Sequence, residues 1–171
     1  MPAVSEDMIL DQVNQSDVPV GQVVRRDVFA KHAGFRVAHV LIVNSEGKLL
    51  LQRLALSRKR NPGAWGSSVA SYLFASESYE AAAARRVKEE LGVTGSLLTF
   101  LGKTEMMDDG CLKFIGVFTM SYDGPFTIDR SQILGIEFVS LRSLQRMVDG
   151  GARQFTPTFL QVFRFYSSRS H

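Results

Sequence analysis

The sequence has 171 residues, of which 45% are hydrophobic and 22% are charged. This composition predicts one globular domain over residues 1–171 and excludes collagen-like, low-complexity and disordered classes. The formal net charge of +3 is too small to indicate a stable complex with nucleic acid. A lone cysteine, Cys111, with no apolar run long enough to cross a membrane and no secretory signal pattern at the start, predicts a cytoplasmic protein without membrane association.

Basic residues are concentrated in one part of the chain. Residues 1–24 contain four acidic residues and no Lys or Arg, whereas residues 25–60 contain nine basic residues against Asp27 and Glu46. Two interpretations are open at this point. The charges form either ordinary solvated faces or a cationic wall that faces an anionic ligand.

A β-hairpin is expected next along the chain. Residues 37–43 (VAHVLIV) are rich in β-branched residues and predict a strand, residues 44–47 form a turn signal, and residues 48–53 predict the returning strand. A basic loop with Pro62 and Gly63 covers residues 57–66, and a short strand is expected at residues 67–73.

The pattern then changes to that of a helix over residues 77–91, which are rich in Ala, Glu and Arg. Ser76 and Ser78 are candidate N-caps, and Gly92 suits the left-handed position after the helix. Four residues spaced four apart are expected to form its buried stripe. They are Tyr79, Ala83, Val87 and Leu91.

Strands dominate the rest of the chain. They are expected at residues 97–104 and 113–122, around a turn at 106–110, and at 136–141. Helices are expected at residues 140–148 and 156–167. The predicted class is α+β, an α/β/α sandwich around a mixed β-sheet.

Two carboxylates on the central helix suggest chemistry. Arg86, Glu89 and Glu90 share one face of a helix, because residues three and four apart are neighbours. Adjacent carboxylates can bind a hard cation such as Mg²⁺ through oxygen. Taken alone, the sequence Lys-Glu-Glu is more typical of a solvated helix end than of a metal site.

The surrounding residues 71–93 resemble the Nudix box, Gly-x5-Glu-x7-Arg-Glu-U-x-Glu-Glu-x-Gly-U, where U is a bulky aliphatic residue. The resemblance covers roughly residues 20–145 and includes residues 49–53 (LLLQR) and the loop Pro62-Gly63-Ala64-Trp65. It implies the Nudix fold. It also implies a metal-dependent hydrolase that cleaves a phosphoanhydride bond in a nucleoside di- or triphosphate, or in another nucleoside-diphosphate-linked compound.

The resemblance also implies roles for single residues. Glu89 and Glu90 are expected to hold Mg²⁺, or Mn²⁺, and to be the catalytic residues, with Glu90 orienting or deprotonating water. Glu77 and Arg85 match the pair that braces the loop against the helix. The partner is expected to be a small-molecule diphosphate or nucleotide, and the protein a monomer or homodimer. The predicted substrate-binding residues are Arg53, Lys59 and Arg86.

Three positions depart from the pattern. Ser71 replaces the Gly of the box, Gln132 stands where many relatives carry a Glu, and Arg86 replaces the first Glu of Arg-Glu-U-x-Glu-Glu. Because Arg86 is a permanent cation, fewer metals or a weakened, diphosphate-binding module form the main alternative. The residues left open as substitute bases are Glu105, Asp108, Asp109 and Glu137.

Within the family the pattern is most similar to the branch that contains isopentenyl-diphosphate isomerase. That chemistry needs a Cys, a His and a later acidic residue at positions that align here with Ala70, Tyr72 and Lys113. Ala70 cannot transfer a proton, so isomerase activity is the less favoured alternative.

Overall fold

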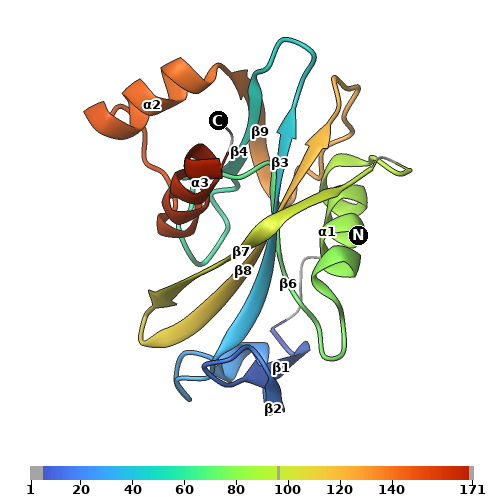
Figure 1. Cartoon of the computed structure of the whole chain (residues 1–171), viewed down its shortest axis with the longest axis vertical. Coiled ribbons are helices and arrows are strands. Elements are labelled where there is room, and N and C mark those ends of the chain that lie inside the picture. Colours follow the sequence, from blue (N-terminus) through green and yellow to red (C-terminus); the bar gives the residue numbers. More distant parts are fainter. Residues whose placement is uncertain (1–5, 96, 170–171) are drawn as a thin grey trace.

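The structure is a computed structural model that describes residues 6–95 and 97–169. Its centre is a seven-stranded sheet with helices on both faces (Figure 1). Its strands are β3 (Phe35–Val43), β4 (Leu49–Leu54), β5 (Trp65–Gly66), β6 (Val69–Tyr72), β7 (Thr99–Asp108), β8 (Cys111–Ser121) and β9 (Ile133–Val139). β3 pairs in parallel with β8, whereas β3 pairs with β4 and β6 in antiparallel fashion. The predicted α/β/α sandwich around a mixed sheet is confirmed.

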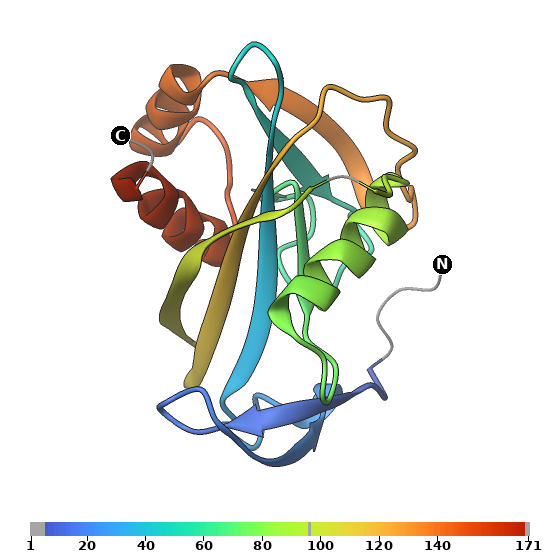
Figure 2. The ribbon, with the colours of Figure 1, turned by 45° about the vertical axis from the view of Figure 1, so that its right-hand side comes forward.

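The sheet separates two apolar cores. Helix α1 (Tyr79–Leu91) covers one face, and helices α2 (Leu141–Gly150) and α3 (Pro157–Arg169) cover the other (Figure 2). This division follows from the alternation of side chains along β3, since successive residues of a strand point to opposite faces. Val40 packs in the core under α1, and Leu41 packs in the core under α2 and α3.

Helix α1 ends where the sequence predicts and begins at Tyr79, two residues later than predicted, because Ser78 and not Ser76 is its N-cap. The Ser78 hydroxyl accepts a hydrogen bond from the Ala81 amide at 3.1 Å, and Gly92 adopts φ 67° after the last turn. Tyr79 at the start of the helix lies directly over Gly116 of β8, where a Cβ atom would be only 2.5 Å from Tyr79 Cδ1. The helix therefore sits closer to the sheet than any larger residue at position 116 would allow.

A two-stranded hairpin of β1 (Ile9–Val13) and β2 (Pro19–Val24) precedes the sheet, which the sequence did not lead us to expect. Asp17 in its turn is buried and accepts hydrogen bonds from Arg36 Nε at 2.6 Å, Tyr79 Oη at 2.7 Å and Lys103 Nζ at 2.7 Å. These contacts attach the hairpin to β3, α1 and β7. The 3-10 helix Arg25–Asp27 follows directly, so the hairpin positions Arg25.

The later strands differ in extent from their prediction. The expected turn at residues 106–110 shrinks to Asp109 and Gly110, because β7 continues to Asp108. No helix in the described part of the chain is long and apolar enough to cross a membrane. The single domain over residues 1–171 stays a prediction, because residues 1–5, 96 and 170–171 lie outside the described residues.

Candidate functional site

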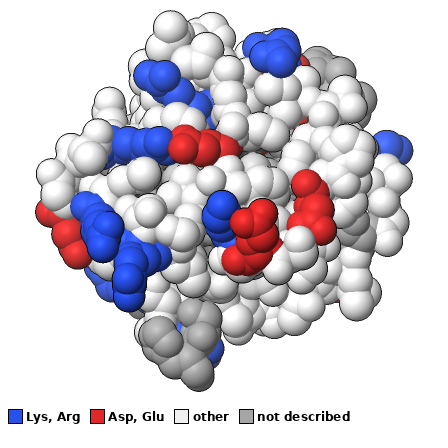
Figure 3. Space-filling model, turned by 90° about the horizontal axis from the view of Figure 1, so that it is seen from above, with Lys and Arg blue, Asp and Glu red and all other residues white. Residues whose placement is uncertain are grey.

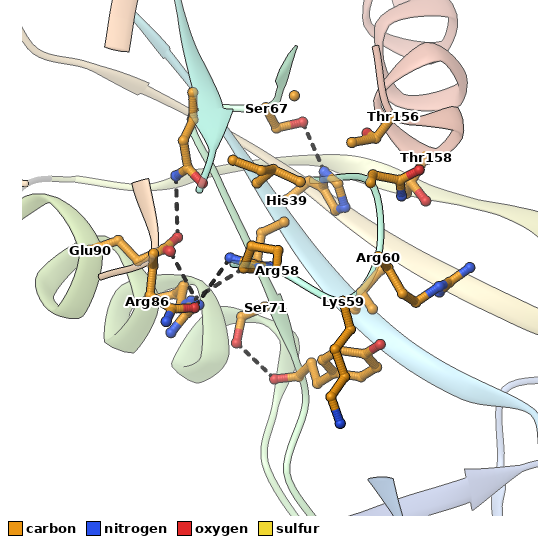
Figure 4. Close-up of a pocket in the computed structure, with 18 of the residues that line it drawn as sticks. His39, Arg58, Lys59, Arg60, Ser67, Ser71, Arg86, Glu90, Thr156 and Thr158 are labelled. Carbon is orange, nitrogen blue, oxygen red and sulfur yellow. Dashed lines mark hydrogen bonds and ion pairs between the residues drawn. The ribbon is translucent and has the colours of Figure 1, made fainter. Parts of the chain in front are cut away.

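A pocket of about 470 Å³ opens where several distant segments meet (Figure 4). Its lining comes from the start of the 3-10 helix, β3, β6, α1, the loop over residues 57–61 and the beginning of α3. Glu90 and Arg86 lie at one end, and His39, Ser67 and Thr158 lie at the other, with Arg58 between them (Figure 4). The two ends differ in chemistry.

The first end is built on the inward face of α1. Arg86 and Glu90 are both buried, and Arg86 Nη2 lies 3.1 Å from Glu90 Oε2. Arg86 Nε also donates to the Ala70 carbonyl at 3.3 Å, and Gln52 Nε2 donates to Glu90 Oε1 at 3.3 Å. Burial raises the pKa of the Glu90 carboxyl above its ordinary value, although the Arg86 charge opposes this.

Glu89 faces away from this pocket and belongs to a second network. Arg85 donates to both Glu77 oxygens, at 2.8 and 2.9 Å, and to Glu89 Oε1 at 2.8 Å. It also donates to the Ser71 hydroxyl at 3.0 Å and to the Tyr72 carbonyl at 3.1 Å. Arg85 thus ties the end of β6 and the loop before α1 to the helix, the bracing expected of the pair Glu77 and Arg85.

The arrangement does not fit a site for a resident divalent cation. Arg85 holds one oxygen of Glu89, while the Arg86 guanidinium lies 3.6 Å from the other and 3.1 Å from Glu90 Oε2. Among the described residues no group of three His, Cys, Asp or Glu side chains could hold a metal ion. Two unit charges about 4 Å apart interact by about 4 kcal/mol at an effective dielectric constant of about 20, and a divalent ion doubles this repulsion. This geometry does not support Glu89 and Glu90 as metal ligands, and that role stays a prediction from the sequence.

Basic side chains dominate the rest of the pocket. Five of the nine basic residues between positions 25 and 60 line it, namely Arg25, Arg26, Arg58, Lys59 and Arg60. Three of the five are paired with acids outside the pocket centre: Arg26 with Asp7, Lys59 with Glu6, and Arg60 with Asp108 and Asp109. Within the described residues, Arg25 and Arg58 form no ion pair with a carboxylate.

Arg25 and Arg58 are accordingly the charges that remain available. Arg25 Nε is buried without a hydrogen-bond partner in the described chain, and its guanidinium lies 4.6 Å from the centre of the Tyr72 ring. Arg58 donates to Gln132 Oε1 at 3.3 Å. Burial lowers the pKa of Arg58, and the positive charges of Arg86 and Arg25 act in the same direction. The site is therefore short of negative charge.

The second end of the pocket is polar but close to neutral. His39 Nδ1 shares a hydrogen bond with the Ser67 hydroxyl at 2.8 Å, and burial together with the Lys113 charge lowers the pKa of His39 to about 3. The Lys113 ammonium is itself buried and donates to Asp108 at 2.9 Å and to the Thr158 hydroxyl at 2.7 Å. This end offers hydrogen bonds rather than net charge.

Two groups of predicted residues do not reach the pocket. Arg53 is exposed, donates to the Gly63 carbonyl at 2.9 Å and does not line the cavity. Like Arg53, the substitute bases Glu105, Asp108, Asp109 and Glu137 do not line the pocket. Lys59 does line it, although its side chain is largely solvent-exposed.

Several lining residues had no signal in the sequence. Gln52 and His39 lie in segments that the sequence predicts only as strands, and Thr158 lies beyond the resemblance. Only the packing of α3 against the sheet brings Thr158 beside Lys113. Gln132, which stands where relatives carry an acid, does line the pocket as the acceptor for Arg58.

The outer surface gives no support to a nucleic-acid partner on the face that Figure 3 presents. On that face, basic and acidic side chains are interspersed among uncharged residues and form no continuous basic surface. Binding to a phosphate backbone is typical of such a continuous surface. The pocket is therefore the feature that points to a ligand.

The comparison with protein families now identifies the fold. The model of the NUDIX domain matches residues 34–159. The chain belongs to the Nudix family. The uncharacterized Nudix hydrolase PA4841 of Pseudomonas aeruginosa is 27% identical over 164 residues, which are 96% of each chain. Among solved structures, DR0079 from Deinococcus radiodurans is similar with a TM-score of 0.81 and 25% identity, over 91% of this chain and 97% of that one.

The Nudix relatives also include an isomerase. An isopentenyl-diphosphate Delta-isomerase of Streptomyces avermitilis is 29% identical over 150 residues, 82% of this chain and 75% of the isomerase. The three aligned positions Ala70, Tyr72 and Lys113 all line the pocket. They supply a methyl group, a phenol and an ammonium where isomerase chemistry needs a thiol, an imidazole and an acid. The named Nudix hydrolases among the relatives support hydrolase activity as the general class, and Nudix enzymes generally use divalent metals.

Proposed function

We propose that this chain is a hydrolase that cleaves a phosphoanhydride bond in a small molecule of the nucleoside-diphosphate-linked kind. The observation that carries the proposal is the buried carboxylate of Glu90 in a pocket with Arg86 and Arg58 beside it. Guanidinium groups bind phosphate oxygens in bidentate fashion, and a carboxyl group with a raised pKa is a better base near neutral pH. The second, neutral end of the pocket suits the uncharged part of such a substrate.

In the proposed reaction, side chains of the protein accept the proton and stabilise the developing charge. The oxygen of a water molecule bonds to phosphorus, the bond from phosphorus to the bridging oxygen breaks, and the leaving phosphate takes the electron pair. Glu90 accepts the proton that water loses. Arg58 and Arg86 stabilise the charge that grows on the phosphate oxygens. Mg²⁺ and Mn²⁺ stay predicted cofactors.

The test is a panel of diphosphate compounds with identification of the products. Nucleoside di- and triphosphates, ADP-ribose, dinucleoside polyphosphates and isopentenyl diphosphate are incubated with Mg²⁺, with Mn²⁺ and with EDTA. We expect one class to give phosphomonoester products. Glu90→Gln is expected to lower kcat by about 100-fold or more, since general base catalysis contributes on the order of 10²–10⁴.

Glu80→Gln is the matched control, because Glu80 lies on the same helix but is exposed. It is expected to keep wild-type activity. If no compound is cleaved, or if Glu90→Gln retains the wild-type kcat, the proposal is wrong. Rearrangement of isopentenyl diphosphate without hydrolysis of any compound would instead support the isomerase alternative.

A second candidate function, a diphosphate-binding module without efficient catalysis, is favoured by the position of Arg86 between Glu89 and Glu90. It predicts tight binding of a panel compound that is not cleaved. Arg86→Glu separates the two candidates, because it restores the carboxylate of the Nudix box. A large gain in metal-dependent hydrolysis in this variant would identify the native site as a weakened enzyme.

A further inference from the structure

The carboxylates in and beside α1 already lie against guanidinium groups of the protein, which bears on how a diphosphate is held. Arg85 pairs with Glu77 and Glu89, and Arg86 faces Glu89 and Glu90. The Arg86 position is fixed on both sides, because Nε donates to the Ala70 carbonyl while the terminal nitrogens face the carboxylates. A positive group of the protein thus occupies the space where a bound cation would meet these oxygens.

The neighbouring guanidinium groups leave an excess of positive charge. Arg25 and Arg58 line the same pocket as Arg86, and within the described residues neither forms an ion pair with a carboxylate, although the Glu90 charge acts on Arg58 against the effect of burial on its pKa. The buried Arg25 Nε has no partner in that part of the chain, and Arg58 has a single neutral acceptor in Gln132. Partly buried charges without a carboxylate partner are incompletely compensated, and a dianionic ligand between these groups supplies the missing negative charge.

We propose that the pocket binds the diphosphate group of its ligand without a divalent cation, and that Arg86, Arg58 and Arg25 supply the positive charge. The inference deepens the proposed function and depends on it for the class of ligand. It goes further, because it assigns to these three arginine side chains the charge compensation that a bridging metal would supply. Arg86 lies next to Glu90, the carboxylate that would take a proton from water, and Arg58 lies in the middle of the pocket beside them (Figure 4).

The experiment measures binding of inorganic pyrophosphate and of methylenediphosphonate, which cannot be hydrolysed at its bridge. Titration calorimetry is carried out on the full chain in EDTA and in Mg²⁺. We expect binding in EDTA with a Kd no more than about threefold weaker than in Mg²⁺. Arg86→Gln and Arg58→Gln are each expected to weaken binding in EDTA at least tenfold, and Arg86→Lys is expected to restore part of the loss.

Arg164→Gln is the control, since Arg164 is exposed on α3 and does not line the pocket. Its Kd should equal that of the wild type. Arg86→Gln leaves a buried carboxylate with less compensation, so its folding is checked by urea denaturation. If Arg86→Gln fails to fold, Arg58→Gln still tests the inference. Arg58 makes one hydrogen bond to a neutral partner, so its replacement leaves no carboxylate without its ion pair and should not prevent folding.

The outcomes separate this inference from the proposed function. Binding that needs Mg²⁺ and is absent in EDTA overturns the inference, even if the enzyme then hydrolyses a panel compound. Binding in EDTA that survives Arg86→Gln and Arg58→Gln also overturns it, and so does a lack of binding in both buffers. Binding in EDTA that these variants abolish supports the inference, even if no compound is hydrolysed and the proposed function fails.

Discussion

At the scale of single residues, His39 shows how burial fixes a protonation state. Its ring is enclosed in the sheet beside the Lys113 ammonium, and these two effects lower its pKa to about 3. The ring is therefore neutral at pH 7. With Nδ1 engaged by Ser67, the other ring nitrogen is available to a ligand in the pocket. A neutral imidazole suits the uncharged part of a substrate better than it suits a phosphate.

The same shift predicts a loss of stability in acid. The pKa is about 6.5 in the unfolded chain and about 3 in the fold, so the unfolded state binds more protons between these values. The free energy of unfolding should fall by about 1.4 kcal/mol per pH unit as pH drops through this window. Urea denaturation at pH 7.5 and pH 4.5 measures the slope. His39→Asn should reduce the difference in the free energy of unfolding between these two pH values by about 2–3 kcal/mol. Equal slopes for His39→Asn and the wild type would contradict the assignment of a buried neutral ring.

The residues of the site were predictable only where sequence spacing sets their geometry. Arg86 and Glu90 are four apart on a helix, so their contact follows from the helical repeat alone. Arg53 ends a strand near the pocket, but the β4–β5 turn directs its side chain to the Gly63 carbonyl. Thr158 meets Lys113 across many intervening residues, and no local pattern encodes such a contact.

At the scale of elements, α1 is predictable from its own residues, whereas the N-terminal hairpin is not. α1 carries its own signals, since Ser78 caps its start and Gly92 ends it. The hairpin of β1 and β2 depends on Asp17, whose partners Arg36, Tyr79 and Lys103 are far away in the sequence. A two-stranded hairpin is marginal by itself, so contacts of this kind determine whether it forms.

The close approach of α1 to the sheet predicts a difference between two glycines in strands. Gly116→Ala places a methyl group against the Tyr79 ring and should destabilise the fold by about 1–3 kcal/mol, a typical result of overpacking. Gly135→Ala in β9 meets no atom within 4 Å and should change the free energy of unfolding by less than about 0.5 kcal/mol. Urea denaturation of both variants checks this. Equal effects would mean that α1 does not rest on Gly116.

At the scale of the whole molecule, the sheet separates two cores that do not share residues. Val87 belongs to the core under α1, and Val162 belongs to the core under α2 and α3. The sequence predicted both helical layers, because each apolar stripe needs a sheet face to cover. It could not predict which residues of α3 would reach the pocket, since that depends on the angle at which the layers pack.

The separation of the cores predicts that their mutations act independently. Val87→Ala and Val162→Ala should each cost about 2 kcal/mol through lost burial and cavity formation. The double variant should lose the sum to within about 0.5 kcal/mol, because the sites share no partners. Equilibrium unfolding of the wild type, the single variants and the double variant completes the cycle. A coupling energy above about 1 kcal/mol would show that the sheet transmits packing changes from one face to the other.

The origin of the pocket lining has a consequence for the protein during its synthesis. Arg25 follows the N-terminal hairpin, while Thr158 belongs to the last helix that the structure describes. A ribosome releases these segments at very different times, and domains fold as their chain emerges. A nascent chain that has already formed α1, with Glu90 and Arg86 in place, still lacks the wall that α3 contributes. The ligand therefore meets a complete pocket only on chains whose translation has passed that helix.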